Sequence, residues 1–315
     1  MNNSPRYAPP GKFLAEITQR CLQGRYLLRP SQQLNELIAG VVAKAGDKYP
    51  VEIVGLAVPS NHYHLLATAS NQKDLSSFMN FVASNVAREA SRLHGWEGKF
   101  WAHRYECIPI TDEEEIQVER LKYLLSQGCK EGLVASPRNW PGLNSAEAQM
   151  GGTGIPGIWV DRTALYRARR KKGGEQLQPS DFAEALCLEL APLPCWAQLS
   201  PEEHQSRIRD LVEEIERETA ARHRQEGTQP LGRRAILRQN PRRRSEVPET
   251  RPAPRVHAAT RAARSHFLEA YRIFLRAYRA AATKLRAGDL SVEFPEGCFP
   301  PSRPFVEAGP SPPRG

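Results

Sequence analysis

Residues 57–70 read AVPSNHYHLLATAS, and the stretch Asn61-His62-Tyr63-His64-Leu65-Leu66 within them decides the fold and the chemistry. In an extended strand successive side chains point to opposite faces, so His62 and His64 share a face and Tyr63 points the other way. Two imidazoles about 7 Å apart on one face can bind a divalent cation, since neutral histidine is the commonest side-chain metal ligand. The alternative is a half-buried strand that merely carries two histidines.

The composition fits a soluble globular protein. The chain has 315 residues, of which 40% are hydrophobic and 25% charged, which allows two domains and a sizeable core. No run approaches 18 apolar residues, and the N-terminus lacks the apolar region of a signal peptide. We therefore expect a cytoplasmic protein with no membrane partner. The six cysteines show no CxxC spacing, which indicates reduced thiols rather than a zinc site or disulfides.

The net charge of +9 is unevenly distributed along the chain. Residues 1–150 contain 16 basic and 15 acidic residues, whereas residues 231–286 contain 15 basic and 3 acidic ones. This asymmetry predicts a nearly neutral folded core joined to a polyanion-binding extension. Nucleic acid is the expected polyanion; acidic lipid is the alternative, disfavoured because proline and arginine-rich turns interrupt the basic block.

The first half of the chain alternates between strand and helix patterns. Residues 11–28 predict a strand or a hairpin arm, and Ser31 is the expected N-cap of the helix that follows. Residues 51–57 form a β-branched run, and after a Pro-Ser-Asn turn residues 62–69 are the expected hairpin partner.

Three more elements follow the histidine strand. Asp74 or Ser76 is the expected cap of a second helix, and residues 100–110 predict another strand. Thr111 is the expected N-cap of a third helix, with Glu114 completing a capping box. The order is β-α-β-β-α-β-α, which is typical of the ferredoxin-like split βαβ arrangement of the α+β class. We expect an antiparallel sheet with helices on one face, the other face free for a site, and the strand of residues 62–69 in its interior.

The second half of the chain is predicted to be mainly helical and basic. Residues 138–160 are rich in glycine, proline and asparagine and predict a domain boundary, so we divide the chain at 1–145, 146–230 and 231–315. Residues 181–226 and 257–287 have helical patterns. Six arginines form a block between them: Arg233, Arg234, Arg238, Arg242, Arg243 and Arg244.

The third helix offers partners for the histidine pair. Tyr123 and Gln127 are spaced i, i+4, which places them on one face of a helix. A glutamine carbonyl oxygen is an acceptable ligand for Mg²⁺ or Mn²⁺, and a tyrosine can attack a phosphodiester polarised by such an ion. For each residue alone, a structural role in the core or at a solvated helix end is the simpler interpretation.

The motifs NHYHLL, FWAHRYE and KYLLSQGCKEGLVASPRNWPG, taken in this order, resemble those of the HUH single-strand transposases with one catalytic tyrosine. This superfamily includes the insertion-sequence transposases and the REP-associated tyrosine transposases, and the resemblance covers about residues 12–145. It implies that His62 and His64 are metal ligands, Tyr123 is the nucleophile and Gln127 is the third ligand, with Mg²⁺ or Mn²⁺ as the cofactor.

The chain departs from the family pattern at two places. REP-associated members commonly have Met-Pro-Asn-His before the histidine pair, where this chain has Val58-Pro59-Ser60-Asn61-His62. Their tyrosine helix typically continues into Asn-Pro, which is lacking between Tyr123 and Gly132 here. The departures concern the subfamily and the C-terminal bend of the helix.

The resemblance implies an enzyme that nicks and rejoins single-stranded or hairpin DNA through a covalent 5′-phosphotyrosine, in transposition or recombination. An inactive or domesticated protein that holds hairpin repeats without cleavage is the alternative. A relaxase or replication initiator shares the chemistry but usually has another order of motifs. Monomer and homodimer are both left open. The DNA-binding residues expected from their charge are Arg104, Arg233, Arg234, Arg238, Arg242, Arg243 and Arg244.

Overall fold

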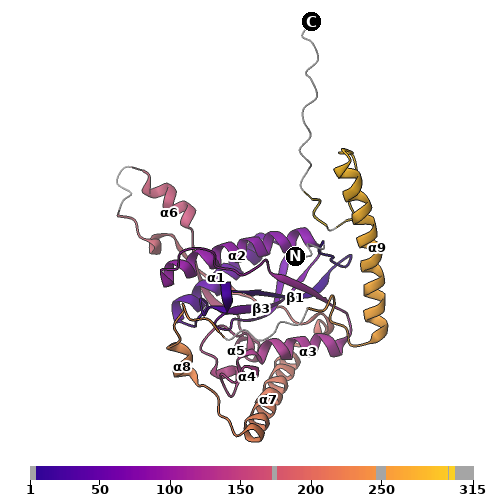
Figure 1. Cartoon of the computed structure of the whole chain (residues 1–315). Coiled ribbons are helices and arrows are strands. Elements are labelled where there is room, and N and C mark those ends of the chain that lie inside the picture. Colours follow the sequence, from indigo (N-terminus) through magenta and orange to yellow (C-terminus); the bar gives the residue numbers. More distant parts are fainter. Residues whose placement is uncertain (1–4, 172–175, 246–252, 297, 302–315) are drawn as a thin grey trace.

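A four-stranded antiparallel sheet forms the centre of the protein (Figure 1). The computed structural model describes residues 5–171, 176–245, 253–296 and 298–301. The sheet order is β2-β3-β1-β4, and the strands are β1 (Phe13–Arg20), β2 (Val51–Ala57), β3 (His62–Ala69) and β4 (Glu106–Ile110). The predicted ferredoxin-like βαββαβα order is confirmed, and the histidine strand β3 lies in the interior of the sheet.

Helices pack on both faces of this sheet. The helices α1 (Gln32–Lys48) and α2 (Gln72–His94) cover one face, and α3 (Glu114–Leu125) crosses the other (Figure 1). The expectation of an entirely free second face was wrong, because Leu14, Val54 and Leu66 form an apolar cluster with leucines of α3. The part of this face at the His62 end of β3 remains for the site.

Strand β3 alternates as its sequence predicts. Tyr63, Leu65 and Ala67 belong to the core beneath α1 and α2, whereas His62, His64 and Leu66 lie on the face toward α3. Tyr63 is buried, and its hydroxyl donates to Gln19 Oε1 over 2.7 Å. The prediction that Tyr63 faces away from the histidine pair is therefore confirmed.

The expected helix caps are partly confirmed. Ser31 caps α1, with its side chain accepting from the Leu34 amide. For α2 the expected caps, Asp74 and Ser76, were wrong. The N-cap is Asn71, whose side-chain oxygen accepts from the backbone amide of Asp74, so the helix begins before either expected residue.

Thr111 is likewise not the cap of α3. Its hydroxyl donates to Glu113, and α3 begins at Glu114 without a side-chain cap. The Glu113 carboxylate accepts instead from the amides of Ala259 and Thr260, far along the chain. A long-range contact has replaced the local capping box.

Two expected strands are shorter than their sequence patterns. The strand predicted over residues 11–28 is β1, which ends at Arg20 and is followed by a 3-10 turn at Leu22–Gly24. The strand predicted over residues 100–110 begins only at Glu106. Before β4 begins, the Phe100 carbonyl accepts from the Leu22 amide. Phe100 thus contacts the turn that follows β1, ahead of the regular pairing between β1 and β4.

The second half of the chain contains helices and one hairpin. Strands β5 (Ile155–Val160) and β6 (Ala183–Leu188) pair antiparallel, so the helix expected from residue 181 begins only at α7. The remaining helices are α4 (Gln127–Lys130), α5 (Ala146–Gly151), α6 (Arg162–Arg169), α7 (Pro201–Glu226), α8 (Arg233–Leu237) and α9 (Arg261–Arg286). The helix expected over residues 257–287 is α9, capped by Thr260.

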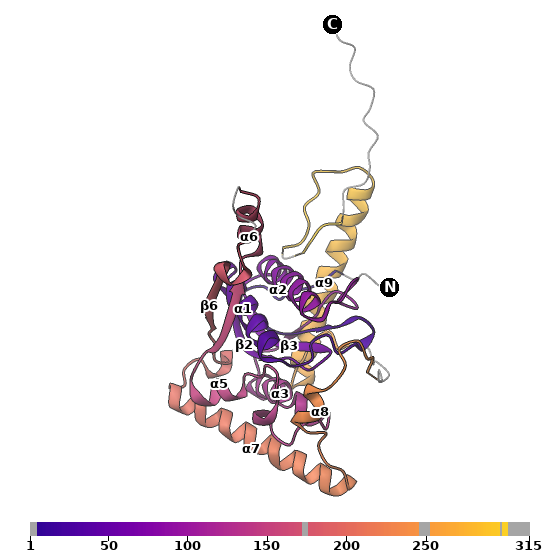
Figure 2. The same cartoon turned by 90° about the vertical axis from the view of Figure 1, so that its left-hand side faces the viewer.

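The later elements pack against the sheet domain. The β5–β6 hairpin lies against α1, and α7 runs beneath α3 and α5 (Figure 2). Helix α9 stands at the edge near β4, where Tyr7 packs against Phe267 and Phe274. In the described part of the chain no helix is long and apolar enough to cross a membrane, and all six cysteines are free. The three predicted domain ranges stay a prediction.

The hairpin approaches α1 backbone to backbone at two glycines. A Cβ atom added to Gly40 would overlap the backbone of Ile158, and one added to Gly157 would overlap the backbone of Gly40. A side chain at either position must therefore separate α1 from β5.

We predict that Gly40→Ala destabilises the protein by at least about 2 kcal/mol, because the backbone of β5 has to move. Gly46→Ala in the same helix meets no atom within 4 Å and is the matched control. It is expected to be neutral or stabilising by up to about 1 kcal/mol. Urea unfolding measures both variants; equal stability of the two would contradict the close contact.

Candidate active site

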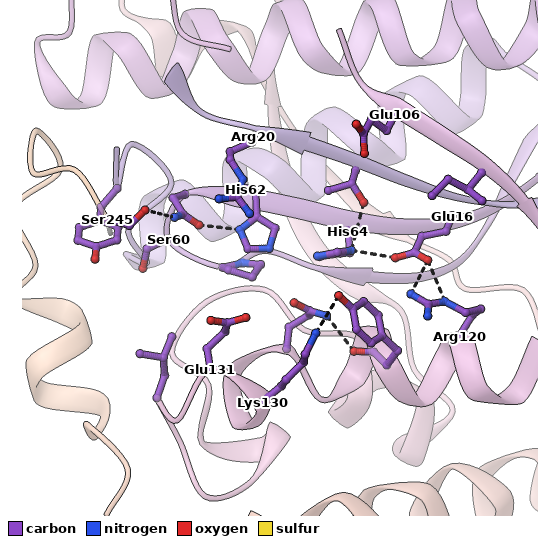
Figure 3. Close-up of a pocket in the computed structure, with 18 of the residues that line it drawn as sticks. Glu16, Arg20, Ser60, His62, His64, Glu106, Arg120, Lys130, Glu131 and Ser245 are labelled. Carbon is purple, nitrogen blue, oxygen red and sulfur yellow. Dashed lines mark hydrogen bonds and ion pairs between the residues drawn. The ribbon is translucent and has the colours of Figure 1, made fainter. Parts of the chain in front are cut away.

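Strands β1 and β3 place five polar side chains on one face of the sheet. His64 pairs with Thr18 and His62 with Arg20 in the antiparallel register, and Glu16 lies one step further along β1. These residues line a cavity of about 920 Å³ between the sheet and the end of α3 (Figure 3). Both histidines are buried, with His62 7% and His64 6% exposed.

The hydrogen bonds of the two imidazoles orient both rings in the same way. Nδ1 of His62 lies 2.6 Å from Asn61 Oδ1, and Nδ1 of His64 lies 3.1 Å from Glu16 Oε1. An acceptor oxygen at Nδ1 selects the tautomer whose lone pair is on Nε2. Nε2 of each ring is thus the atom available to coordinate a cation, and the two rings lie with their centroids 4.9 Å apart.

Burial lowers the pKa of His62 well below its ordinary value, and the neighbouring His64 and Arg20 lower it further. A side-chain hydrogen bond to Gln127 opposes this lowering of the pKa but does not outweigh it. His62 is therefore neutral at physiological pH, which is the protonation state that a metal ligand requires.

Tyr123 lies beside the histidine pair. Its ring centroid is 5.6 Å from that of His64, and two cations lie against the ring. The guanidinium of Arg120 is 4.0 Å from the ring centroid, and Lys130 Nζ is 4.2 Å from it. Lys130 also donates to the Tyr123 hydroxyl over 3.1 Å. A phosphate brought to this hydroxyl would meet positive charge.

Gln127 reaches the same cavity although the helix is interrupted. Helix α3 ends at Leu125, and α4 begins at Gln127 after the single residue Ser126. The Gln127 amide nitrogen donates to the Tyr123 carbonyl over 3.0 Å, which keeps the expected i, i+4 relation. Because the nitrogen is used in this way, the side-chain oxygen is the atom left to accept or to coordinate.

Glu16 is a buried carboxylate at the centre of the site. It is 4% exposed and contacts His64, Arg120 and His257, with Arg120 Nη2 2.6 Å and His257 Nε2 3.0 Å from its Oε2. Burial alone would raise the pKa of Glu16, but the close contacts with His257 and His64 and the charge of Arg120 hold it well below the ordinary value. Glu16 is therefore ionised throughout the physiological range.

The donor set fits a divalent cation of the Mg²⁺ or Mn²⁺ type. Within the described ranges no three His, Cys, Asp or Glu side chains gather in an arrangement that could hold a metal ion. A bound cation would instead rest on Nε2 of His62 and His64 and on the Gln127 oxygen, with water completing the shell. The Nδ1 contacts to Asn61 and Glu16 are of the kind that orient metal-binding histidines.

The arginines expected to bind DNA are not gathered in one place. Arg243 and Arg244 line the same cavity as the histidine pair and Tyr123. The other four arginines of the block do not line it: Arg233, Arg234, Arg238 and Arg242. Arg104 lines two neighbouring grooves; one of them also contains Arg88, Arg92 and Lys99 and has no acidic residue among its lining side chains.

Part of the chain is similar to a known protein family. Residues 25–127 match the family model described as "Transposase IS200 like". This third of the chain is similar to the IS200-like transposase family. The sequence-based assignment to the single-tyrosine HUH transposases is thereby confirmed, and the family implies an enzyme that cleaves DNA and is generally metal-dependent.

Two solved structures are similar to part of this chain. One is a REP-associated tyrosine transposase bound to a REP hairpin, with 18% identity over 48% of this chain and 86% of that chain and a TM-score of 0.40. The other is a putative transposase from Deinococcus radiodurans R1, with 18% identity over 40% of this chain and 98% of that chain and a TM-score of 0.28. No curated protein matches the chain.

Four residues of the transposase site were not expected from the sequence. Glu16 could have been suspected, because it is a lone acid in the otherwise apolar run Phe13–Ile17 of a buried strand. Arg120 and Lys130 continue the helical spacing of Tyr123 and Gln127 and carried a weaker signal. His257 had no local signal, since its partner lies at the other end of the chain.

We predict that Glu16→Gln destabilises the protein by about 3 kcal/mol at pH 7, because Arg120 and His257 then face an uncharged amide in a buried site. Glu131→Gln, at an exposed acid of the same cavity, is the control and should change little. Urea unfolding at pH 7 compares the two variants with the wild type.

The pH dependence follows from the lowered pKa of Glu16. A carboxylate whose pKa is lower in the folded than in the unfolded state stabilises the protein fully above the unfolded-state pKa of about 4.3. This stabilisation is lost as the pH falls from there toward the pKa of the folded state. The stability difference between wild type and Glu16→Gln should therefore shrink below about pH 4.3. A difference in unfolding free energy that stays constant from pH 7 to pH 3 would contradict the lowered pKa of Glu16.

Proposed function

We propose that the protein is an HUH-type transposase that nicks and rejoins single-stranded or hairpin DNA through a covalent 5′-phosphotyrosine at Tyr123. The observation that carries the proposal is the convergence of His62, His64, Tyr123 and Gln127 on one cavity. These residues come from β3 and from the α3–α4 region, and they are the four to which the family resemblance in the sequence assigned the site.

In the proposed step the Tyr123 hydroxyl oxygen attacks the scissile phosphorus, and the bond between phosphorus and the 3′ oxygen breaks. The phenolic proton is given up, and the departing 3′ oxygen takes up a proton, so a free 3′-OH and a tyrosine ester of the 5′ phosphate are formed. A second 3′-OH can reverse the step and join a different end. The energy of the ester is conserved, so no nucleotide cofactor is required.

The residues around Tyr123 have distinct tasks in this step. Lys130, 3.1 Å from the hydroxyl, stabilises the negative charge that develops on it, and Arg120 holds the ring from its face. A cation held by His62, His64 and Gln127 would supply Lewis-acid polarisation of the scissile phosphate. Asn61 and Glu16 keep the two imidazoles oriented for that cation.

We predict that Tyr123→Phe abolishes covalent adduct formation with a single-stranded hairpin oligonucleotide in Mn²⁺ while leaving noncovalent binding within about twofold, because only the hydroxyl is lost. Denaturing gel electrophoresis detects the adduct, and filter binding measures the affinity. Tyr166→Phe, at an exposed tyrosine of α6, is the control. Tight hairpin binding by the wild type without any adduct would favour the inactive DNA-binding alternative and contradict the proposal.

We predict that Arg243→Gln combined with Arg244→Gln weakens single-stranded DNA binding and lowers the slope of log K against log salt by about 0.7 for each phosphate that the protein no longer neutralises. The matched control is Arg233→Gln combined with Arg234→Gln on α8, outside the cavity. Filter binding at several salt concentrations compares the two pairs. Equal weakening by both pairs would indicate a diffuse basic surface rather than binding of phosphates at the cavity.

A further inference from the structure

Two stretches from the C-terminal half of the chain lie at the rim of the cavity. We call residues 239–245 and 253–260 together the C-terminal strap; residues 246–252 are outside the described ranges. The cavity is lined by Gln239, Arg243, Arg244 and Ser245 from the first stretch and by Pro254 and His257 from the second.

The second stretch is fixed to the sheet domain by its backbone. The His257 amide donates to the Pro109 carbonyl over 2.9 Å, and the His257 carbonyl accepts from the Thr111 amide over 3.0 Å. The amides of Ala259 and Thr260 each donate to the Glu113 carboxylate over 3.0 Å. These contacts run along the end of β4 and hold His257 in one position.

From this position the His257 side chain reaches the active site. Its Nε2 lies 3.0 Å from Glu16 Oε2, and the side chain is 13% exposed. The other oxygen of the same carboxylate contacts His64 Nδ1 over 3.1 Å. His257, Glu16 and His64 thus form a continuous chain from the strap to one of the two metal-ligand candidates.

The first stretch makes the equivalent contact to the other histidine. Ser245 Oγ accepts from Asn61 Nδ2 over 3.0 Å, and the same amide group presents its oxygen to His62 Nδ1 over 2.6 Å. Ser60, the residue before Asn61, donates to Gln239 Oε1 over 2.7 Å. Figure 3 shows Ser245 at the His62 end of the cavity and Glu16 at the His64 end.

We propose that the C-terminal strap completes the active site by positioning both histidines, through His257–Glu16–His64 on one side and Ser245–Asn61–His62 on the other. The inference rests on the proposed metal-dependent function and extends it: His257 and Ser245 are positioning residues that touch neither DNA nor metal. Fixing the groups behind a ligand limits the rotation of that ligand and strengthens metal binding. The C-terminal half is therefore part of the catalytic unit as well as a basic extension.

The test measures Mn²⁺ affinity of the full chain by electron paramagnetic resonance or calorimetry, without DNA. His257→Ala should weaken Mn²⁺ binding by about tenfold or more, the usual cost of removing a group that orients a metal ligand. His257→Gln, whose amide can still donate to Glu16, should recover a large part of the affinity. Hairpin DNA affinity measured in EDTA should stay within about twofold of the wild type, since neither substitution removes a side chain that binds phosphate.

Two comparisons separate positioning from a general loss of structure. His266→Ala, on the exposed face of α9 nine residues further on, is the matched control and should bind Mn²⁺ like the wild type. In a Glu16→Gln background, His257→Ala should weaken Mn²⁺ binding by much less than it does alone, because the histidine acts through that carboxylate. An effect of full size in that background would overturn the proposed route.

The outcomes also separate this inference from the proposed function. If the wild type binds Mn²⁺ and forms the Tyr123 adduct, but His257→Ala binds Mn²⁺ equally well, the strap proposal is wrong and the proposed function stands. If the wild type binds no Mn²⁺, both are overturned. Loss of Mn²⁺ affinity in His257→Ala with recovery in His257→Gln supports the strap as a positioning element.

Discussion

The site depends on the pairing of one buried, ionised carboxylate, that of Glu16, with the charged and polar groups around it. A charge that is 4% exposed costs several kcal/mol unless it is paired, and Glu16 is paired on every side, with His64, Arg120 and His257. These partners come from β3, α3 and the segment before α9. One buried charge thus fixes the sheet, the tyrosine helix and the C-terminal half of the chain relative to one another.

The same contacts connect the metal-ligand candidates with Tyr123, the proposed nucleophile. Glu16 orients His64 through Nδ1 and also holds Arg120, whose guanidinium lies against the ring of Tyr123. Lys130 approaches the Tyr123 hydroxyl from α4, the short helix that also carries Gln127 into the cavity. His64 and Tyr123 therefore belong to a single preorganised unit, because Glu16 orients the first directly and the second through Arg120.

The features that could be predicted from the sequence are those set by local patterns, such as the alternation of a strand and the cap of a helix. The alternation of β3 placed His62 and His64 on one face and Tyr63 in the core, and Ser31 was recognisable as a cap. The sequence did not predict contacts between distant segments. The β5–β6 hairpin lies partly in a glycine-rich stretch that resembles a boundary, and Gly157 of β5 allows a close approach to Gly40 of α1 that only the folded chain reveals. Thr111 and Glu114 were expected to form a capping box, but the neighbouring Glu113 binds the amides of Ala259 and Thr260 before α9.

The central claim is that Tyr123, and not Tyr63 of the histidine motif, forms the bond with DNA. Peptide mapping by mass spectrometry, after reaction of the protein with a hairpin oligonucleotide in Mn²⁺ and nuclease digestion, tests it most directly. We expect a nucleotide joined through its 5′ phosphate to the peptide that contains Tyr123, and none on the peptide that contains Tyr63. A nucleotide on any other residue, or cleaved DNA with no modified peptide, would contradict it.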